Sequence, residues 1–226
     1  MFAAIFSPQL FSFLAFMGIF LLLIGVTEFL YRFLKLPAEQ SRKFIHVSGG
    51  IMCLFLPVFF NSHIWPLLLA VLSFLLLFMT YATKYLNSIH KTKRRSIGSI
   101  IFPVPVYFCF LTAELSNNNL YFYIPVALLT FSDTAAEIAG NKWGYTGKQF
   151  FKGQKTLAGT TAFFVTSIIV CSLFFYFLPH IQTSQIIYFS LIISALTATA
   201  ELITLHGWDN LTIPVVADIV LYILLK

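Results

Sequence analysis

The chain has 226 residues, of which 59% are hydrophobic and 10% are charged. A soluble domain carries about a quarter charged residues, so this composition excludes an ordinary water-soluble fold. The formal net charge of +6 would suit anionic partners, but the positions of the charges matter more than their sum, and we expect membrane lipids rather than nucleic acid as partners. Cys53, Cys109 and Cys171 lie in apolar runs and form no C-x-x-C pair, which argues against a disulfide framework or a cysteine-bound metal.

Apolar runs that are long enough to cross about 30 Å of hydrocarbon as helices occupy most of the chain. The predicted spans are 10–31, 45–61, 64–82, 97–115, 120–140, 158–178, 185–205 and 212–225. The first run has no basic region before it and no clear cleavage site, so we expect a membrane helix and not a removed signal peptide. The connectors are short. The sequence therefore predicts an all-α, polytopic membrane bundle of about eight helices, forming a single domain over residues 1–226.

The basic residues gather in alternate connectors. Arginines and lysines lie between residues 32 and 43, between 84 and 95 and between 142 and 155, whereas the connectors 61–63, 116–119 and 179–184 contain none. Basic connectors stay on the cytoplasmic side of a membrane. We therefore predict an integral protein of the cell membrane, with its basic loops in the cytoplasm and both termini outside.

Two carboxylates lie on one face of the span 120–140. Asp133 and Glu137 are four residues apart, and Gly140 and Gly144 continue the same helical face. The glycines alone would suit a close packing seam between helices, with the acids paired to lysines. A carboxylate in a transmembrane segment is costly unless it is paired or hydrated, which favours a functional site that opens to the cytoplasm.

A second polar stripe runs along the span 185–205. It consists of Ser194, Thr197, Glu201 and Thr204. This helical spacing predicts that Glu201 faces the bundle interior, either in a site or in a buried hydrogen bond between helices. Asp209 and Asn210 follow at the cytoplasmic mouth, where Asp209 could cap the last helix, act in a site, or do both. Among the other acids, Glu28 could pair with Arg32 one helical turn later.

The segment 141–160, NKWGYTGKQFFKGQKTLAGT, joins glycines to four lysines. Amines and backbone N–H groups at a helix start bind polyphosphate, and carboxylates nearby suit Mg²⁺, which needs few protein ligands when substrate phosphates are present. The candidate phosphate contacts are Gly140, Gly144, Lys148, Lys152, Lys155, Thr156, Gly159 and Thr160. For any one lysine, contact with lipid headgroups is an equally good interpretation. The segment does not contain a Walker A pattern.

Two further basic clusters lie at cytoplasmic ends of spans. SRKFIHVSGG, residues 41–50, places Arg42, Lys43 and His46 at one entrance, and KRRSIGS, residues 93–99, places Arg95 at the next. These side chains are candidate nucleotide contacts, although a lone interfacial histidine is more often structural. With the lysine segment they form a cationic ring that faces the acids.

Taken in order, four segments make the chain resemble a known family. They are TEFLYR with RKFIHVSGG, RRSIGSIIFPVPV, SDTAAEIAGNKWG with KGQKTLAGT, and ELITLHGWDNLTIP. Together they resemble the CTP-dependent polyprenol, phytol and diacylglycerol kinases, which include dolichol kinase, over about residues 27–220. Ala158 stands where dolichol kinases and cytidylyltransferases commonly have glutamate, so the resemblance is greater to the phytol and farnesol kinase branch.

The resemblance implies a membrane lipid kinase that uses CTP and Mg²⁺. Asp133 would serve metal or nucleotide binding, and Lys155, Thr156, Gly159 and Thr160 would hold phosphate. Glu201, Asp209 and Asn210 would complete the site. The expected metal ligands are Asp133, Glu137 and Glu201, and the expected base for the lipid hydroxyl is Asp133, Glu137 or Asp209.

Two other functions are compatible with parts of this pattern. A phosphatidate-type cytidylyltransferase would share the block 133–160, but HGWDNLTIP stands in place of its closing motif. An ion-coupled transporter could use intramembrane acids, but transport sites usually lie near the midplane at internal repeats. No repeat is visible here, and the charged groups gather toward one face.

Overall fold

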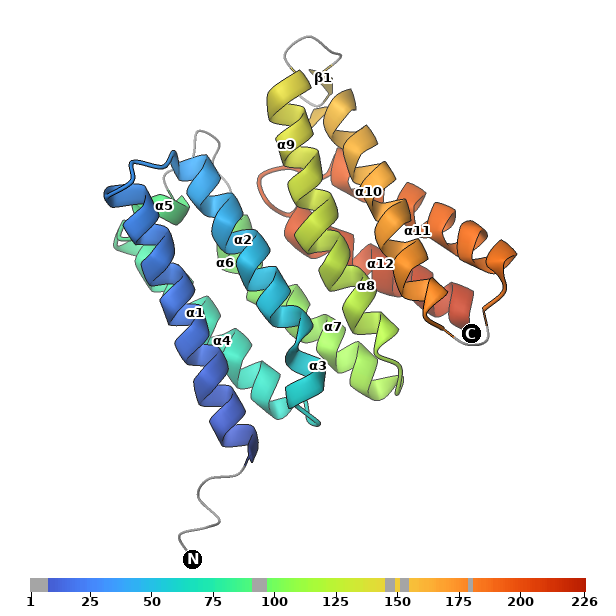
Figure 1. Cartoon of the computed structure of the whole chain (residues 1–226), viewed down its shortest axis with the longest axis horizontal. Helices are drawn as coiled ribbons and strands as arrows, with labels where there is room; N and C mark the ends of the chain where they lie inside the picture. The colour runs from blue at the N-terminus through green and yellow to red at the C-terminus, as the bar shows by residue number, and fades with distance from the viewer. Residues whose placement is uncertain (1–7, 91–96, 145–148, 151–154, 179–180) are drawn as a thin grey trace, which may run out of the picture.

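The structure, a computed structural model, describes residues 8–90, 97–144, 149–150, 155–178 and 181–226. Its long helices are α1 (Pro8–Arg32), α2 (Ala38–Leu54), α4 (Ile64–Ala82), α7 (Pro103–Leu115), α8 (Leu120–Ala127), α9 (Asp133–Trp143), α10 (Leu157–Tyr176), α11 (Thr183–Ile203) and α12 (Asp209–Leu225). Shorter elements are α3 (Leu56–Phe59), α5 (Asn87–His90), α6 (Gly98–Ile101), the π turn η2 (Leu128–Ser132) and the strands β1 (Gln149–Phe150) and β2 (Lys155–Thr156). In Figure 1, α1, α2 and α4 lie on the left and α10 and α11 on the right, with α7, α8 and α9 between them.

The predicted all-α membrane bundle is confirmed. Within the described residues, six helical segments are long and apolar enough to cross a membrane, namely Pro8–Arg32, Ala38–Phe59, Ile64–Ala82, Gly98–Leu115, Leu157–Tyr176 and Thr183–Ile203. The other two predicted spans are also helical. One is the consecutive run α8–η2–α9, and the other is α12, which has 17 residues.

Aromatic and aliphatic side chains fill the interior between α8, α10, α11 and α12. Phe122, Phe163, Phe175 and Ile193 are fully buried there, and Leu221 joins them from the last helix. Many large apolar residues on the outer faces of the helices are exposed, as expected for surfaces that contact hydrocarbon rather than water. The packed interior fixes the ends of α9, α10 and α12, which carry most of the polar groups described below.

A π turn lies directly before the first intramembrane acid. In η2 the N–H of Asp133 donates to the carbonyl of Leu128, five residues earlier. Such π turns are uncommon and occur frequently at functional sites. Pro125 lies inside α8 shortly before this turn, and its nitrogen has no hydrogen to donate, so the regular helical hydrogen bonding is already interrupted there. The widened turn sets the direction in which α9 presents its carboxylates.

Glycines bring α9 and the start of α10 into close contact. A Cβ at Gly144 would lie 2.5 Å from Cγ2 of Thr156, and one at Gly159 would lie 2.9 Å from the carbonyl oxygen of Ala136. Both distances are too short for real atoms, so these positions require glycine. The packing interpretation of the glycine face is therefore correct for Gly144, while Gly140 also lines the pocket described next.

Candidate active site

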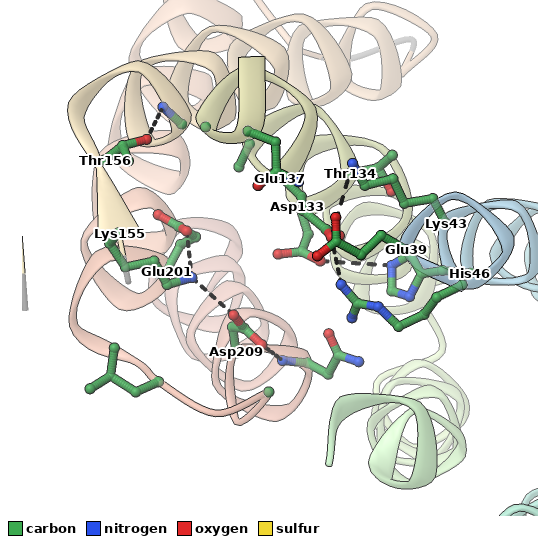
Figure 2. A pocket seen from close by; sticks show the side chains of 18 of the residues that line it. Glu39, Lys43, His46, Asp133, Thr134, Glu137, Lys155, Thr156, Glu201 and Asp209 are labelled. Atoms are coloured by element: carbon green, nitrogen blue, oxygen red, sulfur yellow. Dashed lines mark hydrogen bonds and ion pairs between the residues drawn. The ribbon is translucent and has the colours of Figure 1, made fainter. Parts of the chain in front are cut away.

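A polar pocket lies where α2, α9, β2 with α10, and the α11–α12 turn meet. Its cavity volume is about 160 Å³. Figure 2 shows Lys155, Glu201 and Asp209 on one side of the pocket and Asp133, Glu137 and His46 on the other. Segments far apart in the sequence therefore place acids and bases around one space.

Lys155 joins two carboxylates from different helices. Its Nζ donates to Oε1 of Glu201 at 2.5 Å and to Oδ2 of Asp209 at 2.9 Å. Thr160 donates to the other oxygen of Glu201 at 3.2 Å, so both oxygens of this buried carboxylate have partners. The prediction that Glu201 faces the bundle interior is thus confirmed.

The charge of Lys155 is maintained by these partners. Burial of the amine favours its neutral form, but the negative charges of Asp209 and Glu201 outweigh this effect and raise the pKa of Lys155. The amine is therefore protonated at neutral pH. The short hairpin positions it, because β1 and β2 pair antiparallel and Lys155 lies opposite Phe150.

Glu137 is held by the basic end of α2. Nη2 of Arg42 donates to Oε1 of Glu137 at 2.5 Å, and Nζ of Lys43 lies 4.0 Å from the same oxygen. These side chains are about a fifth to a quarter exposed, so the ion pair is partly shielded from water. The pair connects α2 to α9 across the pocket.

Asp133 differs from the other carboxylates in its contacts. The nearest basic side chain to it among the described residues is His46, whose Nε2 lies 3.9 Å from Oδ2. That nitrogen is 3.0 Å from the backbone carbonyl of Leu129, and a carbonyl can only accept, so Nε2 carries the hydrogen. Among the described residues no side chain donates a hydrogen bond to Asp133 within ordinary distance. Its carboxylate is therefore available to a ligand.

The start of α10 forms the floor beside Lys155. Thr156 is the N-cap, and its hydroxyl accepts a hydrogen bond of 3.1 Å from the backbone N–H of Gly159. Thr156 and Gly159 both line the pocket. A helix start with its backbone donors directed at a cavity is a favourable place for phosphate oxygens.

The acidic side chains of the described residues do not form a complete metal-binding site by themselves. Within the described part of the chain, no three histidine, cysteine, aspartate or glutamate side chains lie close enough to hold an ion by themselves. Glu137 and Glu201 accept hydrogen bonds from basic side chains, whereas the nearest basic side chain to Asp133 among the described residues is His46, at 3.9 Å. This donor set still fits Mg²⁺, which is commonly held by one or two carboxylates together with substrate phosphates and water.

The comparison with protein families agrees with this geometry. The model of a family described as the cytidylyltransferase family matches residues 1–204. The chain belongs to this family. The match includes all of the pocket except the turn before α12 and the start of that helix.

Three curated relatives of this chain are lipid kinases. CTP-dependent diacylglycerol kinase 1 of Saccharomyces cerevisiae is 27% identical over 218 residues, covering 83% of this chain and 74% of that protein. Phytol kinase of Synechocystis sp. is 24% identical over 190 residues, covering 83% and 80%. The corresponding diacylglycerol kinase of Eremothecium gossypii is 30% identical over 132 residues, covering 51% and 39%. No solved structure matches. The predicted resemblance to this group of kinases is confirmed.

Most of the predicted site residues line the pocket. They are Arg42, Lys43, His46, Asp133, Glu137, Gly140, Lys155, Thr156, Gly159, Glu201, Asp209 and Asn210. Gly144 packs against Thr156 instead, and Thr160 supports Glu201 from behind. Lys148, Lys152 and Arg95 lie outside the described residues.

One interpretation of Asp209 is wrong. The N-cap of α12 is Trp208, and Asp209 is the first residue of the helix, where its side chain accepts from Lys155 and from the N–H of Asn210. The pairing considered for Glu28 is confirmed, since Arg32 donates to it at 2.5 Å. Ser88 donates to the other oxygen of Glu28, away from the pocket.

Sequence reasoning missed several lining residues. They are Glu39, Thr134, Ala136, Asn141, Leu205, His206 and Gly207. Glu39 belongs to the first turn of α2, and the spacing 39, 42, 43 and 46 puts it on the same helical face as the three predicted basic residues. This helical spacing could have identified Glu39 from the sequence as a residue that lines the pocket. His206 and Gly207 both have positive φ, at 60° and 88°, in the tight turn between α11 and α12.

Proposed function

We propose that this chain is a CTP-dependent lipid kinase. It transfers the terminal phosphoryl group of CTP to the hydroxyl of a lipid alcohol such as phytol, farnesol, another polyprenol or diacylglycerol. The observation that carries the proposal is the polar pocket, in which the carboxylate of Asp133 faces the partly buried cation Lys155. The similarity to diacylglycerol and phytol kinases supports the same reaction.

The basic side chains of the pocket suit the triphosphate. Lys155, next to the start of α10, offers a cation on one side of the pocket, and Lys43 offers one on the other. Arg42 of the same helix as Lys43 also lines the pocket. Phosphoryl transfer depends mainly on positioning and on neutralising charge, which such groups supply. When bound at Asp133, Mg²⁺ would neutralise phosphate oxygens further. Glu137 would keep Arg42 in place through their ion pair.

The carboxylates also offer a base for the lipid hydroxyl. Glu137 and Asp209 each have an oxygen engaged by a cation at hydrogen-bond distance, so a hydroxyl would have to compete with that contact. Among the described residues, Asp133 has no cation at hydrogen-bond distance. We therefore expect the reaction rate to depend more on Asp133 than on the other carboxylates. Asp133 would either hold the metal or accept the proton of the hydroxyl.

A direct assay tests the proposal. The purified chain is incubated in lipid nanodiscs with CTP or ATP, each labelled in the terminal phosphate, and with phytol, farnesol, longer polyprenols or diacylglycerol. We expect labelled lipid phosphate and CDP, with CTP preferred to ATP. Absence of transfer to every alcohol would contradict the proposal.

The family description favours a second candidate, a cytidylyltransferase that makes a CDP-lipid from a lipid phosphate. That reaction releases pyrophosphate and transfers the α-phosphate with the nucleoside. CTP labelled in the α-phosphate separates the two reactions. Labelled lipid together with pyrophosphate would support the cytidylyltransferase, whereas labelled CDP in solution supports the kinase.

A further inference from the structure

An apolar cavity lies beside the polar pocket. Its volume is about 100 Å³, and its walls come mainly from α1, α2, α4, α5, α6 and α7. Apolar side chains line most of it, among them Phe16, Met52, Leu56, Leu69, Leu77 and Val106. Four of these six, Phe16, Leu56, Leu77 and Val106, are buried, so these parts of the cavity wall belong to the packed interior of the protein.

The two cavities share a border of polar side chains. Arg42, His46 and Asn210 line both of them. The Nε–H of Arg42 is buried and has no hydrogen-bond partner among the described residues. His46 contacts both cavities. Its Nε2 lies 3.9 Å from Oδ2 of Asp133 in the polar pocket. Its ring also packs in a T-shaped contact with Phe102 of the apolar cavity wall, with 5.1 Å between the ring centres.

Two adjacent glycines of α2 have different surroundings. A Cβ at Gly50 would overlap the side chain of Thr130, so Gly50 allows α2 to pack on the π turn. A Cβ at Gly49 would meet nothing within 4 Å, although Gly49 is buried and lines the apolar cavity. Among the described residues, none fills the space beside Gly49.

We propose that the apolar cavity receives the hydrocarbon chain of the lipid alcohol, and that the alcohol's hydroxyl lies at the border formed by Arg42, His46 and Asn210. This inference rests on the proposed function. The occupant must be apolar along its length and polar at one end, because the cavity is apolar and its border with the polar pocket carries hydrogen-bond donors. A hydroxyl at that border lies next to the pocket that contains Asp133 and the proposed triphosphate contacts.

The unfilled space at Gly49 provides the test. Gly49→Leu places a branched side chain in the cavity without a backbone clash, whereas Gly18→Leu places the same side chain on an exposed face of α1 where a Cβ also meets nothing within 4 Å. We expect Gly49→Leu to raise the KM for a long-chain alcohol at least about tenfold, since a few methylenes in a filled pocket change discrimination by this amount or more. The KM for CTP should stay the same. Gly18→Leu should behave as the wild type, and equal lipid KM values for the two variants would overturn the proposal.

A binding measurement tests the proposed lipid site independently of kinase activity. A long-chain alcohol that carries a photoreactive diazirine within its hydrocarbon chain is cross-linked to the wild-type chain in nanodiscs, and the labelled peptides are mapped. We expect label on α2 near Gly49 and Met52 and on α4 near Leu69, with loss of that label in Gly49→Leu. Label confined to exposed positions such as Phe11 would overturn the proposal.

Competition identifies the type of alcohol. Unlabelled phytol or farnesol that removes the label would indicate a single-chain isoprenoid, and unlabelled diacylglycerol that removes it would indicate a two-chain substrate. If the wild type binds the probe in the cavity but phosphorylates no alcohol, the proposed kinase activity is wrong and the binding site stands. If it phosphorylates alcohols but labels only outer positions, the site is wrong and the activity stands.

Discussion

At the scale of single residues, the carboxylates of the pocket are distinguished by their partners. Glu201 receives hydrogen bonds from Lys155 and Thr160, and Glu137 is paired with Arg42. Within the described part of the chain, the basic side chain nearest to Asp133 is His46, at 3.9 Å. Acids that are fully engaged hold the pocket together, while an acid without a close donor remains able to bind a ligand. Activity and stability should therefore respond differently when each acid is changed.

Replacement of Asp133 should affect activity without affecting the fold. We expect Asp133→Asn to lower kcat/KM by about 100-fold or more, the size typical of a lost catalytic or charge-stabilising group. The melting temperature should change little, because no described side chain donates a hydrogen bond to this carboxylate. Asp218→Asn is the matched control, since Asp218 lies in a span, bonds to Thr112 and lines neither cavity.

The dependence on Mg²⁺ then separates the two roles of Asp133. If the residue holds the metal, Asp133→Asn should raise the Mg²⁺ concentration for half-maximal rate. If it accepts the proton, kcat should fall while that concentration stays the same. Full activity in the variant would remove Asp133 from the site.

Replacement of Lys155 should reduce both activity and stability. Lys155→Met leaves Glu201, which is almost fully buried, and Asp209 without their shared cation. Removing one partner of a buried ion pair costs about 3 kcal/mol or more. We therefore expect a lower unfolding midpoint in a thermal or denaturant series, together with a large loss of kcat/KM.

A double variant tests the electrostatic reason for that loss. Lys155→Met with Glu201→Gln removes one of the uncompensated charges, so stability should recover in part. Activity should not recover, because the cation proposed to contact the triphosphate is still missing. A double variant as unstable as Lys155→Met alone would contradict this explanation.

At the scale of helices and strands, the pocket depends on how closely α9 approaches the start of α10. Glycines at 144 and 159 permit that approach, and Thr156 lies between the two elements as the N-cap of α10. The same threonine therefore has two constraints. Its hydroxyl must accept from Gly159, and its methyl group must fit against Gly144.

Gly144→Ala should destabilise this contact. The added Cβ would lie 2.5 Å from Cγ2 of Thr156, and Thr156 cannot turn away without giving up its capping hydrogen bond. Overpacking of this kind costs about 1–3 kcal/mol. We expect a lower melting temperature and a weaker affinity for CTP, both measured on the purified chain.

The double variant Gly144→Ala with Thr156→Ser provides the rescue. Serine keeps the hydroxyl that caps α10 and lacks the methyl group that clashes, so most of the lost stability should return. Gly25→Ala is the control, because a Cβ there meets nothing within 4 Å on the exposed face of α1. If the double variant is no better than Gly144→Ala, the clash with Cγ2 is not the cause.

At the scale of the whole molecule, the sequence was sufficient for the helical spans because burial in hydrocarbon leaves a simple apolar signal. Spacing also predicted that Asp133 and Glu137 share a face and that Glu201 faces inward. It could not predict that Lys155 joins Glu201 to Asp209, because that contact depends on how α10, α11 and α12 pack. The apolar cavity was likewise hidden, since its walls come mainly from helices distributed over the first half of the chain.

The orientation in the membrane is a prediction for the molecule as a whole. The basic connectors predict that the pocket opens to the cytoplasm, where CTP is available. Ser116 lies in the connector between α7 and α8, and Lys142 lies near the end of α9 beside the pocket; both residues are exposed. The two positions therefore report on opposite sides of the bundle.

Cysteine labelling in intact cells measures this orientation. We expect Ser116→Cys to react with a membrane-impermeant maleimide added outside, and Lys142→Cys to react only after the cells are permeabilised. Labelling of the wild-type chain gives the background reaction of its own cysteines, of which Cys109 and Cys171 are buried. The reverse pattern would place the pocket outside the cell, where a cytoplasmic nucleotide could not reach it, and would contradict the kinase proposal along with the orientation.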